Sequence, residues 1–248
     1  MLIVANWKAY VADIKKAKKL FAISKRLAKA THNHIVLAPP APFLGALAAK
    51  NTSVVDFSAQ DISATTGGAH TGEITASAYA TSGATYALIG HSECRGRGDT
   101  NAIVATKLAC TIAHGLTPIL CVGEHERDGE GRYLATIREE LTTAIEPLAK
   151  KDRTDIIIAY EPIWAIWKDA ERAIGPSDLT EMVLYIRKIL AELLTNKNST
   201  DMLILYGGSL APDNVRELGA GTGIDGFLIG HASTDVDTFA LIVKQLAS

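Results

Sequence analysis

The chain has 248 residues, of which 48% are hydrophobic and 21% are charged, and its formal net charge is −2. These values describe a globular chain long enough for one large domain, and they give no indication of a nucleic-acid or membrane partner. No apolar run approaches the roughly 18 residues of a membrane span. Three cysteines (Cys94, Cys110 and Cys121) without metal-site spacing, and no leader-like N-terminal run, predict a cytoplasmic protein.

Short runs rich in β-branched and aliphatic residues recur along the whole chain, and each predicts a β-strand. Most of them are apolar almost without interruption, which is typical of parallel strands buried on both faces. In chain order they cover residues 2–6, 34–38, 54–59, 85–90, 117–122, 155–160, 202–206 and 225–229.

Segments with helical patterns separate these runs. Residues 13–30 carry apolar side chains at helical spacing, and residues 100–115 begin with cap-type residues and end at a glycine. In residues 176–194 we expect Ser177 to be the N-cap, with Glu181 in the first turn near the capping-box position. Strands and helices therefore alternate throughout the chain.

Eight strand–helix units, about 30 residues each, predict an α/β fold in which residues 1–248 form a single-domain (β/α)8 barrel. A doubly wound open sheet would show the same alternation, but the number of units favours the closed barrel. No Pro/Gly-rich linker or change of composition divides the chain. In such a barrel the functional residues lie on the loops that follow the strands.

Chemically active side chains follow several of the predicted strands. Lys8 comes after the first strand, His91-Ser92-Glu93 after the fourth, and Glu161 after the sixth. The seventh and eighth are followed by Gly207-Gly208-Ser209 and Gly230-His231, where backbone N–H groups can bind an anion. A carboxylate, a histidine, a cation and a phosphate cradle on one rim suit proton abstraction beside the carbonyl of a small phosphorylated molecule.

Other interpretations of these patterns are weaker. The segment GHSEC at 90–94 nearly matches a hydrolase nucleophile elbow, with Ser92 as nucleophile and His231 as its histidine, but Cys94 stands where a small residue is needed. The segment GTGIDG at 221–226 matches a dinucleotide-binding pattern but precedes a strand instead of following one. A non-catalytic barrel that binds phosphate sugars would need no base at Glu161.

Seven motifs occur in order: ANWK (5–8), HTGE (70–73), IGHSE (89–93), CVGE (121–124), AYEPIWAI (159–166), YGGS (206–209) and DGFLIG (225–230). With them the chain closely resembles the triosephosphate isomerase family over essentially its whole length. The resemblance implies a TIM barrel that interconverts dihydroxyacetone phosphate and D-glyceraldehyde 3-phosphate in glycolysis and gluconeogenesis, with no cofactor and no metal. An isomerase of another short phosphorylated ketose or aldose, of the tetrulose phosphate type, is the alternative.

The resemblance also implies catalytic roles. Glu161 matches the family's base, and His91 matches an electrophile that stays neutral at a helix N-terminus. Lys8 and Asn6 match the residues that hold the substrate oxygens, and Glu93 matches a supporting acid. This acid–base chemistry is known for the family and is carried over from it, since spacing alone does not show it.

The remaining matches concern the phosphate, the lid and the subunit interface. Gly207, Gly208, Ser209, Gly230 and His231 match the phosphate site, Ile166 and Leu228 the apolar clamp over the base, and Glu124, Trp164 and Tyr206 the positions that brace the lid. Thr71, in the HTGE motif, matches a loop that enters the partner subunit's site. The resemblance therefore implies a homodimer that acts on a small phosphorylated sugar.

One departure from the family pattern lies directly after the histidine motif. Cys94 stands where the family usually has arginine, and we expect the core ion pair of Asp99 to be either lost or rebuilt with Arg95 or Arg97. The thiol itself has either a lowered pKa beside the helix start or an inert, packed environment.

Two further departures concern the phosphate site. His231 replaces a glycine, and a side chain would be strained there if the position required a conformation that only glycine adopts easily. Trp167 replaces the lid glycine whose backbone N–H contacts the phosphate, and the connection to the next helix is longer. We therefore predict that the lid closes with altered gating.

Overall fold

The structure is a computed structural model, and it describes residues 1–166, 174–194 and 201–247. The parallel strands pair in chain order and β8 pairs with β1, so the sheet closes into a barrel. The strands are β1 (Leu2–Asn6), β2 (His34–Ala38), β3 (Asp56–Ala59), β4 (Tyr86–Ile89), β5 (Thr117–Val122), β6 (Ile157–Tyr160), β7 (Ile204–Tyr206) and β8 (Gly226–Ile229). This closure confirms the single-domain (β/α)8 barrel and excludes the open sheet.

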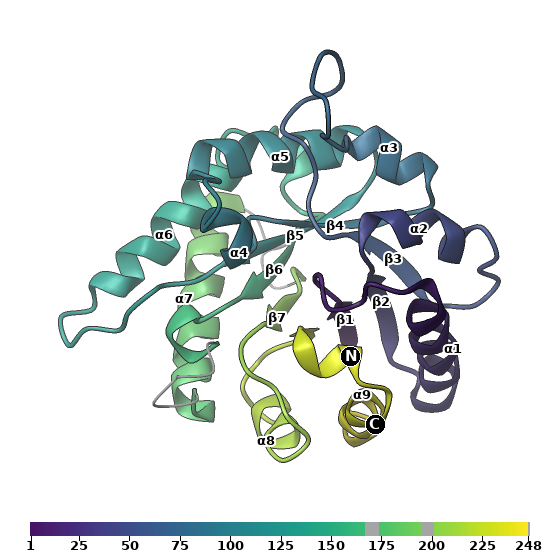
Figure 1. Ribbon diagram of the computed structural model, residues 1–248. Helices are drawn as coiled ribbons and strands as arrows, with labels where there is room; N and C mark the ends of the chain where they lie inside the picture. The colour runs from purple at the N-terminus through teal and green to yellow at the C-terminus, as the bar shows by residue number, and fades with distance from the viewer. Residues whose placement is uncertain (167–173, 195–200, 248) are drawn as a thin grey trace.

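Helices form an outer ring around the barrel (Figure 1). They are α1 (Ile14–Thr31), α2 (Ala41–Ala48), α3 (Ala76–Thr81), α4 (Ser92–Arg95), α5 (Asn101–Ala113), α6 (Arg132–Ile145), α7 (Pro176–Leu194), α8 (Val215–Gly219) and α9 (Val236–Gln245), with the 3-10 helices η1 (Lys150–Asp152), η2 (Ile163–Ala165) and η4 (His231–Thr234). Helices α1 and α9 pack against each other, so the two ends of the chain meet. Within the described residues, no helix combines the length and apolarity that a membrane span requires.

The helix boundaries test the predicted caps. The predicted helix at 100–115 begins with a cap, because the side chain of Thr100 accepts a hydrogen bond from the backbone N–H of Ile103. The predicted Ser177 cap is wrong, because α7 begins at Pro176 and Ser177 lies inside its first turn. Proline suits the first helical position because its φ is already helical and its missing N–H would have no partner there.

The core has two layers, one inside the barrel and one between the barrel and the helices. The inner layer consists of Leu2, Val4, Val36, Ala38, Leu88, Ile119, Cys121, Ile157, Ala159, Leu205 and Leu228. Because every second residue of a strand points inward, the next inward positions past Val4, Ala159, Leu205 and Leu228 are Asn6, Glu161, Gly207 and Gly230. The register that fills the barrel therefore also directs these four residues to its C-terminal rim.

Candidate active site

A cavity of about 300 Å³ lies at this rim, beside the C-terminal ends of β1, β4, β6, β7 and β8. The predicted site residues that line it are Asn6, Lys8, His91, Glu161, Ile166, Gly207, Gly208, Ser209, Leu228, Gly230 and His231. Glu93 does not line the cavity but bonds to Lys8 at its edge. Thr71 lies elsewhere, in an exposed loop, and Trp167 lies outside the described residues.

Glu161 is the carboxylate of this cavity, and only 3% of its surface is exposed. Its backbone N–H donates to the carbonyl of Val122 at 2.8 Å, which fixes the end of β6 against β5. Its Oε2 accepts from the backbone N–H of Ser92 at 3.1 Å, and its Oε1 lies 3.2 Å from His91 Nε2. Gly207 leaves room for the side chain, since a Cβ there would lie 2.9 Å from Glu161 Cγ.

The tautomer of His91 follows from its hydrogen bonds. His91 caps the short helix α4, and its Nδ1 accepts from the backbone N–H of Glu93 at 3.1 Å. A ring nitrogen that accepts carries no proton, so a neutral ring has its proton on Nε2. This Nε2 is the atom that faces Glu161. The site thus presents a neutral imidazole N–H beside a buried carboxylate.

Lys8 is held by its neighbours in an uncommon backbone conformation, with φ of 46°. Its N–H donates to Asn6 Oδ1 at 3.0 Å, and its carbonyl accepts from Gln60 Nε2 at 2.9 Å. Its Nζ donates to Glu93 Oε1 at 2.9 Å. Partial burial raises the pKa of Glu93, but the hydrogen bond and charge of Lys8 outweigh it, so the pKa falls below its ordinary value. Glu93 is therefore an ionised partner that orients the ammonium group.

The loops after β7 and β8 form the remaining wall. Gly208 must lack a side chain, because a Cβ there would lie 2.1 Å from Tyr206 Oη. Ser209 Oγ donates to the carbonyl of Ala165 at 2.8 Å, which ties this wall to the segment after β6. The ring of His231 packs edge-on against Tyr10, with ring centroids 4.6 Å apart.

The segment that follows Glu161 is anchored on Glu124, a carboxylate with 1% of its surface exposed. Glu124 Oε1 accepts from Trp164 Nε1 at 2.7 Å, from Tyr160 Oη at 2.8 Å and from Arg127 Nε at 3.3 Å. Burial, followed by the charge of Glu124, raises the pKa of Tyr160 well above its ordinary value, so the phenol remains a donor. The described part of the predicted lid is therefore docked through Trp164.

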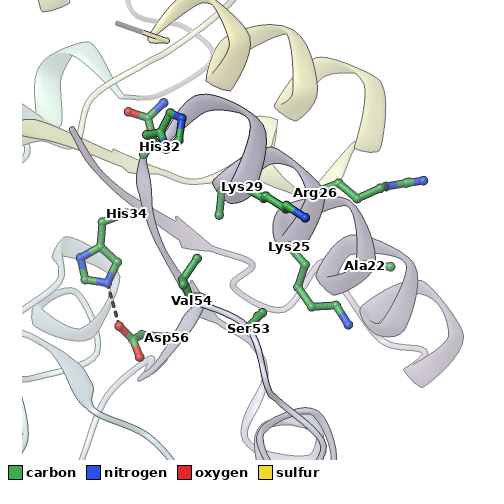
Figure 2. A pocket seen from close by; sticks show the side chains of 11 residues that line it. Ala22, Lys25, Arg26, Lys29, His32, His34, Ser53, Val54 and Asp56 are labelled. Carbon is green, nitrogen blue, oxygen red and sulfur yellow. Dashed lines mark hydrogen bonds and ion pairs between the residues drawn. The ribbon is translucent and has the colours of Figure 1, made fainter.

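A larger groove, about 1300 Å³, lies at the opposite, N-terminal end of the strands. Figure 2 shows Lys25, Arg26 and Lys29 of α1 on one side of it and His34 with Asp56 on the other. His34 Nε2 lies 2.7 Å from Asp56 Oδ2, but these side chains are 42% and 39% exposed. Because water surrounds both groups, the groove has no desolvated acid or base, and the smaller cavity is the better candidate for chemistry.

Comparison with known proteins agrees with this geometry. The family model described as triosephosphate isomerase matches residues 1–246. The triosephosphate isomerase of Streptomyces coelicolor is 36% identical over 251 residues, which cover 98% of this chain and 96% of that protein. Those of Thermus thermophilus (34% over 247 residues, 98% of each chain) and Halorhodospira halophila (39% over 216 residues, 86% of each chain) are similar as well. The chain belongs to the triosephosphate isomerase family.

Asp99, the acidic residue downstream of the family's arginine position, has a different partner from the two predicted arginines. Lys107 Nζ lies 2.7 Å from both Asp99 Oδ2 and Asp61 Oδ2, so the ion pair is rebuilt with a lysine of α5. Asp61, Cys94 and Asp99 have potential metal-ligand atoms within 4.8 Å of one another. The Lys107 ammonium already provides a cation to both carboxylates of this group.

Cys94 has the second of its two predicted environments. Burial raises the pKa of its thiol to about 12, and the charge of Asp61 acts in the same direction. Arg97 Nη2 donates to its Sγ at 3.1 Å. A thiol that stays protonated is a poor nucleophile, so Cys94 is a packed, inert residue.

Of the two departures from the family pattern at the predicted phosphate site, the structure describes only the one at His231. His231 begins η4 without strain, because the non-glycine residues with positive φ in the described chain are Lys8 and His32. The position therefore does not require glycine. Trp167, and with it the predicted change in lid gating, lies outside the described residues.

Sequence reasoning missed three features of this site. The backbone N–H of Ser92, not its hydroxyl, binds Glu161, and its place at a helix start is the signal for this contact. Position 123 must be glycine, because a Cβ there would lie 1.8 Å from the carbonyl oxygen of Glu161. A glycine directly after a predicted strand is the sequence signal for such a close approach. Glu140 binds the N–H of Gly123 from α6, and nothing in the local sequence predicts that contact.

Proposed function

We propose that this protein interconverts dihydroxyacetone phosphate and D-glyceraldehyde 3-phosphate, the reaction for which its relatives are named. The observation that carries the proposal is the buried carboxylate of Glu161, which faces His91 Nε2 at 3.2 Å inside the cavity that Lys8 also lines. A carboxylate shielded from water and placed beside oriented N–H donors is suited to accept a carbon-bound proton. The reaction belongs to glycolysis and gluconeogenesis.

In the proposed mechanism Glu161 removes a proton from the carbon beside the substrate carbonyl. The bonding electrons move to the carbonyl oxygen and form an enediolate, whose negative charge is stabilised by the Nε2–H of His91 and the ammonium of Lys8. His91 moves a proton between the two oxygens, and Glu161 returns its proton to the neighbouring carbon. Substrate and product have the same atoms and electrons, so the proposal requires no redox cofactor. It requires no metal because His91 and Lys8 stabilise the charge of the enediolate.

The remaining cavity residues bind and enclose the substrate in this proposal. Backbone N–H groups after β7 and β8 bind the phosphate, and the apolar clamp keeps water from the base. The phosphate set comprises Gly207, Gly208, Ser209, Gly230 and His231, with Trp167 from the lid, and the clamp comprises Ile166 and Leu228. Asn6 and Glu93 act by holding Lys8.

A coupled assay of the purified protein tests the assignment directly. Glyceraldehyde 3-phosphate should be turned over with a kcat/KM at least about 100-fold above that for a tetrose phosphate, because the cavity has a volume of only about 300 Å³. A preference for the tetrose phosphate would favour the alternative isomerase. Phosphate-sugar binding without turnover of either compound would show a non-catalytic binding protein.

We also infer that two copies form a homodimer. The segment between β3 and α3 projects beyond the ring of helices in Figure 1, and Thr71 is exposed within it. Ile74, at the base of this segment, is 39% exposed, so a partner surface would remove apolar area from water. Sedimentation should give twice the chain mass, and deletion of residues 67–72 should give a monomer with reduced kcat.

We propose a cytoplasmic location for this single-domain protein. All three cysteines are free, and Cys94 and Cys121 are buried as thiols, which fits a reducing compartment. Fractionation of the source cells should recover the activity in the cytosol, and recovery from an oxidising compartment would contradict the proposal.

A further inference from the structure

Glu140 on α6 does not line the cavity, yet its buried carboxylate contacts Gly123, which packs on Glu161, and Arg95, which lies four residues after His91. Its Oε2 accepts from the N–H of Gly123, and its Oε1 lies beside Arg95. We propose that Glu140 is a positioning residue that holds the His91 loop and the Glu161 strand end in register with each other. This inference rests on the proposed function, because it concerns the same proton transfer.

The first contact fixes the backbone beside Glu161. Glu140 Oε2 accepts from Gly123 N at 2.9 Å, and Gly123 packs so tightly on Glu161 that a Cβ would lie 1.8 Å from its carbonyl oxygen. The two neighbours of Gly123 are bonded to the same segment: Val122 accepts from Glu161 N at 2.8 Å, and Glu124 accepts from the N–H of Ile163 at 3.0 Å. Movement of Gly123 would therefore displace the base.

The second contact fixes the residue before His91. Glu140 Oε1 lies 3.5 Å from Arg95 Nε, and that Nε donates to the carbonyl of Gly90 at 2.9 Å. Arg95 Nη1 donates to Asn101 Oδ1 at 2.7 Å, which anchors the guanidinium on α5. Gly90 has φ of +72°, and a Cβ there would lie 3.2 Å from Arg95 Nη2. Loss of the Glu140 charge would therefore loosen the guanidinium that holds the start of the His91 loop.

The charges around Glu140 make this link sensitive to pH. Burial raises the pKa of Glu140 to about 7; Arg95 and the N–H of Gly123 oppose the rise, and the carboxylates of Glu124 and Glu161 add to it. The thiol of Cys121 also faces this group, and burial keeps its pKa well above the ordinary value, so it stays neutral. Glu140 is consequently charged above about pH 7, and only the charged form attracts Arg95.

Three variants separate positioning from a merely structural contact. Glu140→Leu removes both contacts, whereas Glu140→Gln keeps an acceptor for Gly123 and removes the charge that attracts Arg95. Glu139→Gln is the matched control, because Glu139 is the exposed neighbour on the same helix and the amide keeps an acceptor for the hydrogen bond from Asn101 at 3.3 Å. The measurements are kcat and KM for glyceraldehyde 3-phosphate from pH 6 to pH 9, with circular dichroism to verify folding.

Glu140→Leu should lower kcat about tenfold with KM changed less than about twofold, because sub-ångström displacement of the base affects chemistry more than binding. The ratio of wild-type kcat to Glu140→Gln kcat should rise from about 1 at pH 6 to about 3 at pH 8.5, since the variant resembles the protonated side chain. Glu139→Gln should match the wild type throughout. A ratio independent of pH, or a folded Glu140→Leu protein with wild-type kcat, would overturn the inference.

Two further measurements test the inference if Glu140→Leu does not fold or if the wild type has no isomerase activity. If Glu140→Leu does not fold, the pH dependence of the Glu140→Gln ratio decides alone. If the wild type does not turn over triose phosphates, the proposed function fails, and NMR then tests the positioning separately. The backbone amide signals of Gly123 and His91 should shift together as Glu140 ionises near pH 7 in the wild type, and not in Glu140→Gln; independent behaviour would overturn the link.

Discussion

The two ends of the barrel show that cavity size and chemical competence are separate properties. The N-terminal groove is about 1300 Å³ and the C-terminal cavity about 300 Å³, yet only the smaller one combines a carboxylate 3% exposed with N–H donors directed at it. In the groove the ion pair of His34 and Asp56 is about 40% exposed, and water screens its charges. Charges have strong chemical effects where water is excluded.

The direction of the strands explains why the two ends differ. Helices start near the C-terminal ends of the strands, so free N–H groups, such as that of Ser92 at the start of α4, point into the rim. Helices end at the opposite side, where their free carbonyls favour cations. Lys29 lies in the last turn of α1, as this rule predicts, and contributes to the basic side of the groove (Figure 2). The groove's charge therefore has an ordinary structural explanation.

The largest expected effect concerns Glu161, the proposed proton acceptor in the C-terminal cavity. Glu161→Gln should lower kcat by at least about 10³-fold, because the amide cannot accept the proton, while the fold stays intact. The coupled assay measures the rate, and circular dichroism verifies the fold. A folded variant with a rate near the wild type would rule out the isomerase mechanism.

The next effect separates buried charge from catalysis. Lys107→Met should destabilise the protein by about 2–4 kcal/mol, because Asp61 and Asp99 would lose their shared cation. Urea denaturation measures the change. The kcat of the folded variant should stay within about twofold of the wild type, since this cluster does not line the cavity; a large fall in kcat would join the cluster to the site.

A smaller effect concerns the contribution of Glu140 to the free energy of unfolding, which depends on pH. Folding raises the pKa of the Glu140 carboxyl from the ordinary value of 4.5 to about 7, so the folded protein binds this proton more tightly than the unfolded chain does. The resulting stabilisation is complete below pH 4.5 and is lost as the pH rises through about 7. From pH 4.5 to pH 7.5 the wild type should therefore lose up to about 3 kcal/mol relative to Glu140→Gln. Denaturation of both proteins at several pH values measures the difference. Stability curves that run parallel would show that burial does not raise the pKa of this carboxyl.

The smallest effect is at the other end of the barrel. Asp56→Asn breaks an exposed ion pair and should change the free energy of unfolding by less than about 0.5 kcal/mol, with kcat and KM unchanged. Chemical denaturation and the coupled assay measure both quantities. A clear loss of activity would mean that the groove is coupled to the rim, and the contrast between the two ends would no longer hold.

Several parts of the fold and site could be predicted because they are local properties of the chain. The run at 117–122 is β5 to the residue, since a six-residue, mainly apolar run that begins two residues after a glycine is typical of a strand buried on both faces. Asn6 and Glu161 could be placed at a strand end because the motifs ANWK and AYEPIWAI each join a strand to its loop. The start of α7 could not be predicted, because both Pro176 and Ser177 are residues that favour a helix start, and the sequence pattern does not show which of them begins the helix.

The sequence by itself determined the alternation of strands and helices, the family, and which side chains reach the C-terminal rim, since two-residue and 3.6-residue periods are set by the backbone. Only the tertiary structure decided which tautomer His91 has, that Lys107 replaces the expected arginines as the partner of Asp99, and that Glu140 holds Gly123. These contacts join different elements of the chain or depend on how a helix start is oriented. Their geometry is set by the packing of whole helices on the barrel, which no local pattern encodes.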